Sequence, residues 1–112
     1  YNHGIPAPLK NAIDSVAREW FYKPVAIISY GADAGGVRAV EQLRSVFTNL
    51  RVYNLHDTVN MINYWDQLDD EGQLVPTDSQ IQAAHRVLKS TAFWASKLQP
   101  IRAELKATDA AK

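Results

Sequence analysis

The first four residues combine side chains and backbone groups that could hold a polar, planar ligand. They are Tyr1, Asn2, His3 and Gly4, and an amphipathic stretch follows them directly. An asparagine side chain offers both a hydrogen-bond donor and an acceptor, and the backbone N–H groups at the start of a helix favour an electron-rich or anionic partner. The sequence therefore predicts a binding loop here, although the same residue types also occur in plain turns.

A second stretch of small and polar residues follows a short apolar run at residues 25–28. Its candidate ligand-contacting residues are Ser29, Gly31, Gly35 and Gly36. Open α/β sheets bind ligands beyond the carboxyl ends of their strands, and glycine lets a flat ring approach the backbone closely. No Lys-Ser/Thr pair follows the glycines, so they do not form a Walker phosphate loop. The alternative is a strand-to-helix turn that needs glycine only for its shape.

Other kinds of chemistry find little support in the sequence. The three histidines, His3, His56 and His85, lack metal-ligand spacing, and the absence of cysteine excludes disulfides and thiolate catalysis. The acidic stretch Asp66–Gly72 lacks the EF-hand pattern and is expected to be a solvated loop. Twelve basic and twelve acidic residues cancel, so no net charge draws the chain to nucleic acid or to anionic lipid. No apolar stretch reaches the roughly twenty residues that a membrane span needs.

Alternating helix and strand patterns would position the two candidate stretches. Apolar residues spaced by threes and fours predict helices over Pro8–Trp20, Gly36–Leu50 and Asp78–Leu98. Two short apolar runs predict parallel strands at Val25–Tyr30 and Arg51–Leu55, each buried on both faces. The order predicts a single α/β domain with helices packed on parallel strands.

Local signals refine the second half of the chain. Thr77 and Gln80 have the spacing of a capping box, which announces the last helix, and Pro100 is expected to stop it. Residues 58–64 either extend the second strand or form an irregular crossing. The tail at 106–112 has no core pattern and is expected to be frayed. The three tryptophans are expected to be core or interface anchors: Trp20, Trp65 and Trp94.

Two sequence segments carry a family resemblance. The first is Tyr1-Asn2-His3-Gly4-x-Pro-Ala-Pro-Leu-Lys-Asn-Ala-Ile-Asp, and the second joins Lys23-Pro24-Val25-Ala26-Ile27-Ile28-Ser29-Tyr30-Gly31 to the Gly35–Arg44 segment. In this order and spacing they resemble the flavodoxin-like NADPH-dependent FMN reductases. The resemblance covers the first half of the chain well and the remainder loosely. The loop departs from the family at residues 32–34, where relatives are richer in glycine.

The resemblance implies a fold and a cofactor. Residues 1–105 would be the C-terminal portion of a flavodoxin-like three-layer sandwich, and the family's phosphate-binding loop would precede them and be absent from these 112 residues. FMN would be the cofactor, and NADPH or NADH would supply a hydride that passes through the flavin to a quinone, a free flavin, an azo compound or a metal oxyanion. The cofactor-binding residues would be those of the two candidate stretches. No side chain is expected to act as an acid or base, because the flavin does the chemistry.

Two other functions remain open from the sequence. A flavin-binding electron carrier without nicotinamide activity would have similar loops, and a cofactor-free interaction module could dock onto a complete relative. The resemblance also implies a small-molecule acceptor, a homodimer or tetramer, and no nucleic-acid or membrane partner. The absence of cysteine and of targeting signals leads us to expect a cytoplasmic protein.

Overall fold

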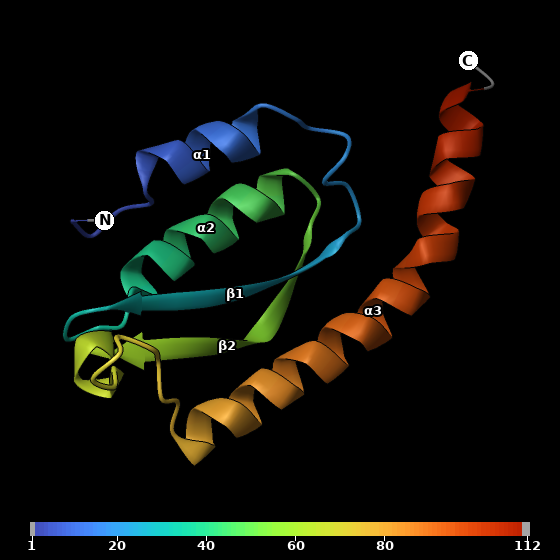
Figure 1. The fold of residues 1–112 in the computed structure, drawn as a ribbon. Coiled ribbons are helices and arrows are strands. Elements are labelled where there is room, and N and C mark those ends of the chain that lie inside the picture. Colours follow the sequence, from blue (N-terminus) through green and yellow to red (C-terminus); the bar gives the residue numbers. More distant parts are fainter. Residues whose placement is uncertain (1, 111–112) are drawn as a thin grey trace.

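The chain folds into three layers, with a two-stranded sheet between two layers of helices. A computed structural model gives the structure and describes residues 2–110. Figure 1 shows the first two helices together on one face of the sheet and the long last helix on the other face. In chain order the elements are α1 (Ala7–Asp14), β1 (Pro24–Gly31), α2 (Val37–Asn49), β2 (Tyr53–Ile62), the 3-10 helix η1 (Tyr64–Gln67) and α3 (Asp78–Ala110). The predicted α/β class is confirmed.

Strands β1 and β2 are parallel, as predicted, and α2 connects them. Gly31 at the end of β1 lies opposite Ile62 at the end of β2, and the register shifts between Val25 and Ile27. β2 is ten residues long, so it includes most of the 58–64 segment that the sequence left open. Because the strands are parallel, both carboxyl ends lie at the same edge of the sheet, where α/β proteins bind ligands.

The main core lies between the sheet and the two shorter helices. Its buried cluster contains Ile13, Leu43, Phe47 and Val52. Trp20 packs on this cluster with its ring centroid 5.5 Å from that of Phe47, and its indole N–H donates to the carbonyl oxygen of Ile13 at 3.0 Å. Burying the ring removes apolar area from water, and the hydrogen bond leaves the donor satisfied. Trp20 is thus a core anchor, as predicted.

The first helix is shorter than predicted, because it ends at Asp14 rather than at Trp20. Ser15 ends it locally: its hydroxyl and its backbone N–H both donate to the carbonyl oxygen of Asn11, at 2.8 and 3.1 Å. A serine that bonds a nearby backbone carbonyl competes with continued helix. The chain then turns back and still buries Trp20, so the apolar spacing that suggested a longer helix is satisfied by a loop.

The last helix is longer than predicted, because it passes through Pro100 and continues to Ala110. The expected stop at Pro100 is therefore wrong, and residues 106–110 are helical where a frayed tail was expected. An interior proline removes one backbone hydrogen bond and bends a helix without having to end it. Figure 1 shows this bend between the orange and red parts of α3. The capping box is confirmed: the Thr77 N–H donates to Gln80 Oε1 at 2.8 Å, and the Gln80 N–H to Thr77 Oγ1 at 3.2 Å.

The strands are less buried than their apolar sequences predict. Ile28 is 59% exposed and Tyr30 is 65% exposed. The reason is the path of α3, which packs more extensively on β2 than on β1. Its Trp94 lies against Tyr53 of β2, with ring centroids 4.2 Å apart. The prediction of strands covered on both faces is thus wrong for the outer part of β1 within residues 2–110.

Candidate functional site

A hollow of about 800 Å³ lies where β1 ends, and we call it the strand-end hollow. The N-terminal loop, the β1–α2 loop, the first turn of α2 and η1 all contribute to its wall. The lining residues used below are Asn2, His3, residues 27–34, Gly36, Arg38, Tyr64 and Trp65. Its volume falls in the range of about 300–1,000 Å³ that is usual for small-molecule sites. The two candidate stretches of the sequence therefore meet in one place, as expected.

The N-terminal loop is held against α2 by a side chain that the sequence analysis missed. Gln42 Nε2 donates to the carbonyl oxygen of His3 at 2.7 Å. Asn2 and His3 both have positive φ, at 48° and 68°, and both side chains are exposed. The loop is thus fixed through its backbone while these side chains remain available to a ligand. Tyr1 lies outside the described residues.

Ser29 belongs to a chain of hydrogen bonds across the strand ends. Its hydroxyl donates to the carbonyl oxygen of Gly35 at 2.6 Å, and Asn60 Nδ2 donates to the same hydroxyl at 2.6 Å. Thr58 Oγ1 in turn donates to Asn60 Oδ1 at 2.8 Å. The chain ties β2 to the β1–α2 loop through the end of β1. Ser29 lines the hollow, but its hydroxyl is used to position the loop.

Glycines 35 and 36 let the β1–α2 loop fold tightly onto the strand ends. Their φ values are 54° and 79°, which residues with a Cβ rarely adopt. A Cβ on Gly36 would lie 3.0 Å from the Tyr30 carbonyl oxygen, and one on Gly35 would lie 3.0 Å from Ile62 Cγ1. These glycines are thus required by the protein's own packing. That they also let the flat ring of a ligand approach the backbone stays a prediction.

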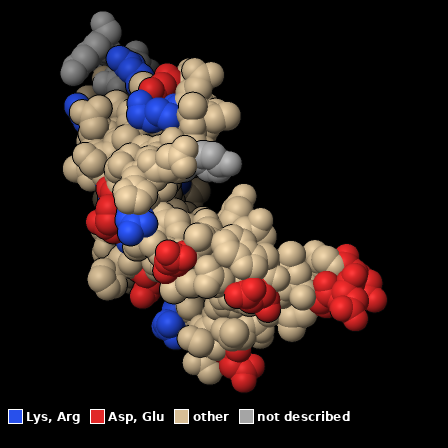
Figure 2. Space-filling view, turned by 90° about the vertical axis from the view of Figure 1, so that its left-hand side faces the viewer, with Lys and Arg blue, Asp and Glu red and all other residues tan. Residues whose placement is uncertain are grey.

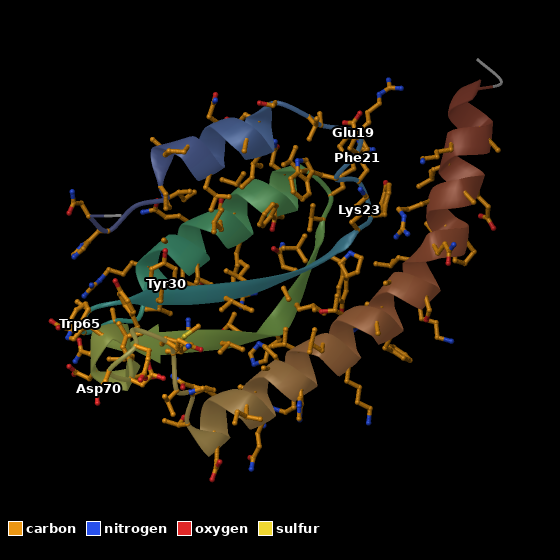
Figure 3. The ribbon with its side chains drawn as sticks, in the orientation of Figure 1. Glu19, Phe21, Lys23, Tyr30, Trp65 and Asp70 are labelled. Atoms are coloured by element: carbon orange, nitrogen blue, oxygen red, sulfur yellow. The ribbon has the colours of Figure 1, made fainter. Side chains whose placement is uncertain are left out.

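Aromatic side chains line the outer part of the hollow. The rings of Tyr30 and Tyr64 meet edge to face at 5.2 Å, and those of Tyr64 and Trp65 at 5.4 Å. In Figure 3, Tyr30 lies over the end of β1 and Trp65 at the outer edge beside it. Trp65 is 49% exposed, so of the two expected roles it is not a core anchor, and the role of interface anchor stays a prediction. Asn63, with φ of 45°, reverses the chain after β2 and brings both rings here. Asparagine adopts this left-handed conformation more readily than most residues, so the turn had a sequence signal that we did not use.

Few charges lie at this end of the molecule apart from an acidic turn. Figure 2 shows mostly uncharged side chains over the middle of this face and acidic side chains gathered at its lower right. The acidic turn of residues 66–72 is on this side, as Asp70 in Figure 3 indicates. Asp69 Oδ1 accepts from the backbone N–H groups of Glu71 and Gln73, at 3.1 and 2.8 Å. This carboxylate therefore has a structural role in the turn.

The hollow suits the ring portion of a flavin better than its phosphate. Aromatic edges, exposed amide groups and the N-terminal turn of α2 provide flat surfaces and polar partners for an electron-rich ring. A doubly charged phosphate prefers several N–H donors together with cationic side chains. Of the described residues that line the hollow, Arg38 carries a permanent positive charge and Asp33 offsets it. The residues thus fit the isoalloxazine and supply no evident phosphate cradle.

Residues 2–110 contain neither a cluster of metal-ligating side chains nor a helix suited to a membrane. No group of three or more His, Cys, Asp or Glu side chains there is arranged to hold a metal ion. None of the helices in that range combines the length and the apolar character that crossing a membrane requires.

Helices on both faces of a parallel sheet, with a ligand-sized hollow at its carboxyl edge, define an α/β protein of the class that binds ligands at this edge. The sequence profile of NADPH-dependent FMN reductases matches residues 1–66. The chain belongs to this family. The family assignment made from the two motifs is confirmed.

Three relatives illustrate the range of similarity. An NADPH:quinone oxidoreductase of Arabidopsis thaliana is 37% identical over 99 residues, covering 83% of this chain and 50% of the relative. NAD(P)H-dependent FMN reductases of Saccharomyces cerevisiae and Schizosaccharomyces pombe are 46% and 50% identical over 52 and 54 residues, each covering 46% of this chain. These two alignments cover 27% and 26% of the relatives. The chain thus spans about half or less of the length of the curated relatives it matches.

Proposed function

We propose that the protein is an NAD(P)H-dependent oxidoreductase that works through bound FMN and delivers electrons to a quinone, a flavin or a similar small acceptor. The observation that carries the proposal is the meeting of both family segments in the strand-end hollow. The N-terminal loop and the β1–α2 loop lie more than twenty residues apart in the chain, yet both line the same cavity. FMN held by these residues would supply two-electron redox chemistry between the nicotinamide donor and the second acceptor.

The residues of this chain supply binding and orientation in the proposal. Asn2 and the backbone of the N-terminal loop hydrogen-bond the polar edge of the ring, which presents one N–H donor and carbonyl acceptors. The tie between Gln42 and His3 keeps that loop in place before the ligand arrives. Arg38 and the N-terminal turn of α2 favour an electron-rich ring over an electron-poor one.

The hydrogen-bond chain through Ser29 gives the second loop a fixed shape. A loop that is already in its binding conformation loses less entropy when the ligand binds. Tyr30, Tyr64 and Trp65 provide apolar surface at the outer side, where a flat nicotinamide or quinone could lie on the flavin. The set of cofactor-binding residues in the proposal is Tyr1, Asn2, His3, Gly4, Ser29, Gly31, Gly35 and Gly36.

The remaining parts of the proposal concern the wider setting of the protein. The similarity to the NADPH:quinone oxidoreductase of Arabidopsis supports a quinone as the acceptor. A homodimer or tetramer and a cytoplasmic location, both expected from the sequence, belong to the same proposal. The choice between NADH and NADPH is left to the experiment.

The test is a kinetic separation of two half-reactions on the flavin-loaded protein. Anaerobic mixing with NADPH or NADH should bleach the visible absorbance of the oxidised flavin. Subsequent addition of a benzoquinone should restore the absorbance. A protein that binds flavin but is not bleached by either nicotinamide would be an electron carrier. A protein that binds no flavin in any form would reject the proposal.

A further inference from the structure

A second hollow, of about 560 Å³, lies at the amino ends of the strands, opposite the strand-end hollow. Five cationic side chains and one carboxylate, that of Glu19, line it. The cations come from the loop before β1, the turn before β2 and the distal part of α3: Arg18, Lys23, Arg51, Arg102 and Lys106. We call this cavity the basic pocket. The chain has equal numbers of basic and acidic residues, twelve of each, so the excess of positive charge is local.

The backbone around the basic pocket is fixed in an uncommon conformation. Tyr22 and Arg51 both have left-handed backbones, with φ of 59° and 55°. The Tyr22 N–H donates to the carbonyl oxygen of Arg51 at 2.9 Å, which joins the loop to the turn. Such conformations are unfavourable for residues with a Cβ and persist where the surrounding structure holds them. The result places the two side chains on one wall of the pocket.

The guanidinium of Arg51 lies over the ring of Phe21, with its central carbon 4.8 Å from the ring centroid. The ring face attracts the cation and orients its flat fork without neutralising it. An oriented guanidinium can donate two parallel hydrogen bonds to one anion. Arg51 is therefore positioned as a fixed hydrogen-bond donor on this wall of the pocket.

The opposite wall is formed by α3 beyond its bend. Arg102 Nη1 donates to the carbonyl oxygen of Tyr22 at 3.2 Å, which docks this part of the helix onto the loop. Lys106 follows one turn later on the same side of the helix. In Figure 3, Glu19, Phe21 and Lys23 lie beside the upper part of α3. The pocket is thus enclosed between two elements that are far apart in the sequence.

We propose that the basic pocket binds a small phosphate-bearing anion with at least two negative charges. Even without Arg18, four cations against one carboxylate leave an excess of three positive charges around one cavity. Glu19 is already used locally, because its Oε2 accepts from the backbone N–H of Ala17 at 3.1 Å. A small anion fits better than an extended acidic chain, because the cations surround a hollow instead of forming a stripe. The proposal does not rest on the function proposed for the strand-end hollow.

The test uses inorganic pyrophosphate as the probe and the full chain as the receptor. Calorimetric titration at low ionic strength should show saturable binding. Amide chemical shifts should change at residues 18–23 and 51, and not at residues 31–36. Raising the salt concentration to about 0.5 M should weaken binding strongly, because the interaction is between charges at a partly open site.

Two double variants separate a local site from overall charge. Lys23→Gln with Lys106→Gln removes two charges from the pocket and should weaken pyrophosphate binding about tenfold or more. Lys89→Gln with Lys97→Gln removes two charges from exposed positions of α3 outside the pocket and should change binding less than about twofold. All four lysines are exposed, so both double variants should fold.

Four outcomes would overturn the proposal. They are a titration without saturation, equal losses in the two double variants, shifts confined to the strand-end hollow, and tighter binding of a hexaglutamate peptide than of pyrophosphate. The last outcome would identify a docking surface for an acidic protein segment in place of a phosphate site.

Discussion

The two ends of the sheet offer ligands different physical environments. The strand-end hollow combines aromatic edges, glycine turns and a chain of satisfied hydrogen bonds, with Arg38 and Asp33 offsetting each other. The basic pocket has four more positive than negative side chains. A flat, weakly charged ring suits the first environment, and a small multivalent anion suits the second. The residues suited to a ring and those suited to a strongly charged phosphate therefore lie at opposite ends of the sheet.

A polypeptide of residues 1–112 gives the strongest test of the separation between ring recognition and phosphate recognition. FMN and riboflavin should bind to it with similar affinity, because the strand-end hollow lacks a phosphate cradle among its described residues. A phosphate cradle with two or three charge-assisted hydrogen bonds would make FMN bind more tightly than riboflavin by about 4 kcal/mol, or roughly a thousandfold in affinity. We expect this difference to be missing. Flavin fluorescence titration measures both constants. FMN binding a hundredfold tighter than riboflavin would show that a phosphate site exists at this end after all.

The next effect concerns the tight fold of the β1–α2 loop. Gly36→Ala should lower the free energy of unfolding by about 2–4 kcal/mol, from left-handed strain and from contact with the Tyr30 carbonyl oxygen. Gly72→Ala is the matched control, because Gly72 has a similar φ of 74° and nothing within 4 Å of an added Cβ. It should cost only about 1 kcal/mol. Urea unfolding of both variants gives the comparison, and equal losses would mean that the loop can move away from the strand.

Asn54 and Asn60 lie near opposite ends of β2, and the lengths of their hydrogen bonds differ. Asn60 makes bonds of 2.6 and 2.8 Å, whereas Asn54 Nδ2 makes bonds of 3.3 and 3.5 Å and its Oδ1 has no partner among the described residues. Asn60→Ala should therefore destabilise the protein by about 1–3 kcal/mol, and Asn54→Ala by less than about 1 kcal/mol. The measurement is again the midpoint of urea unfolding. The reverse order would contradict the assignment of a positioning role to Asn60.

The smallest expected effect is on ring affinity at Asn2. Asn2→Leu keeps the approximate size and removes the polar edge, so flavin should bind more weakly by about 1 kcal/mol, a change of about fivefold. Asn11→Leu, an exposed asparagine on α1, is the control and should leave the affinity unchanged. Riboflavin titration suits this test because it reports on the ring alone. An unaltered constant for the Asn2 variant would remove this side chain from the proposed site.

The sequence predicted the features that depend on local pattern or on family motifs. Parallel strands, the capping box at Thr77 and Gln80, and the meeting of the two loops were all predicted. Features that depend on tertiary packing were not. Ser15 ends α1 by a bond that competes with the helix. α3 continues through Pro100, because an interior proline removes one backbone hydrogen bond and bends a helix without having to end it.

The missed site residues share the same cause. Gln42 lies on an ordinary helix pattern, and only the folded structure brings its amide to the carbonyl oxygen of His3. Trp65 reaches the strand-end hollow through the turn at Asn63. Asparagine favours a positive φ, but that preference alone does not tell where the following rings will lie. The basic pocket could not be predicted from the sequence either, because its cations are scattered along the chain. They come together only when α3 packs on the loop before β1.

The bend in α3 divides the helix into two parts with different tethers. Pro100 lacks the N–H that would bond the carbonyl four residues earlier, so cooperativity between the parts is weakened. The first part is held by Trp94 on Tyr53, and the second by Arg102 on the Tyr22 carbonyl oxygen. Amide hydrogens after Pro100 should therefore exchange with solvent through a local opening that leaves the sheet intact. Because that opening also dismantles one wall of the basic pocket, an anion bound there would slow exchange in the second part of α3 and not in the first.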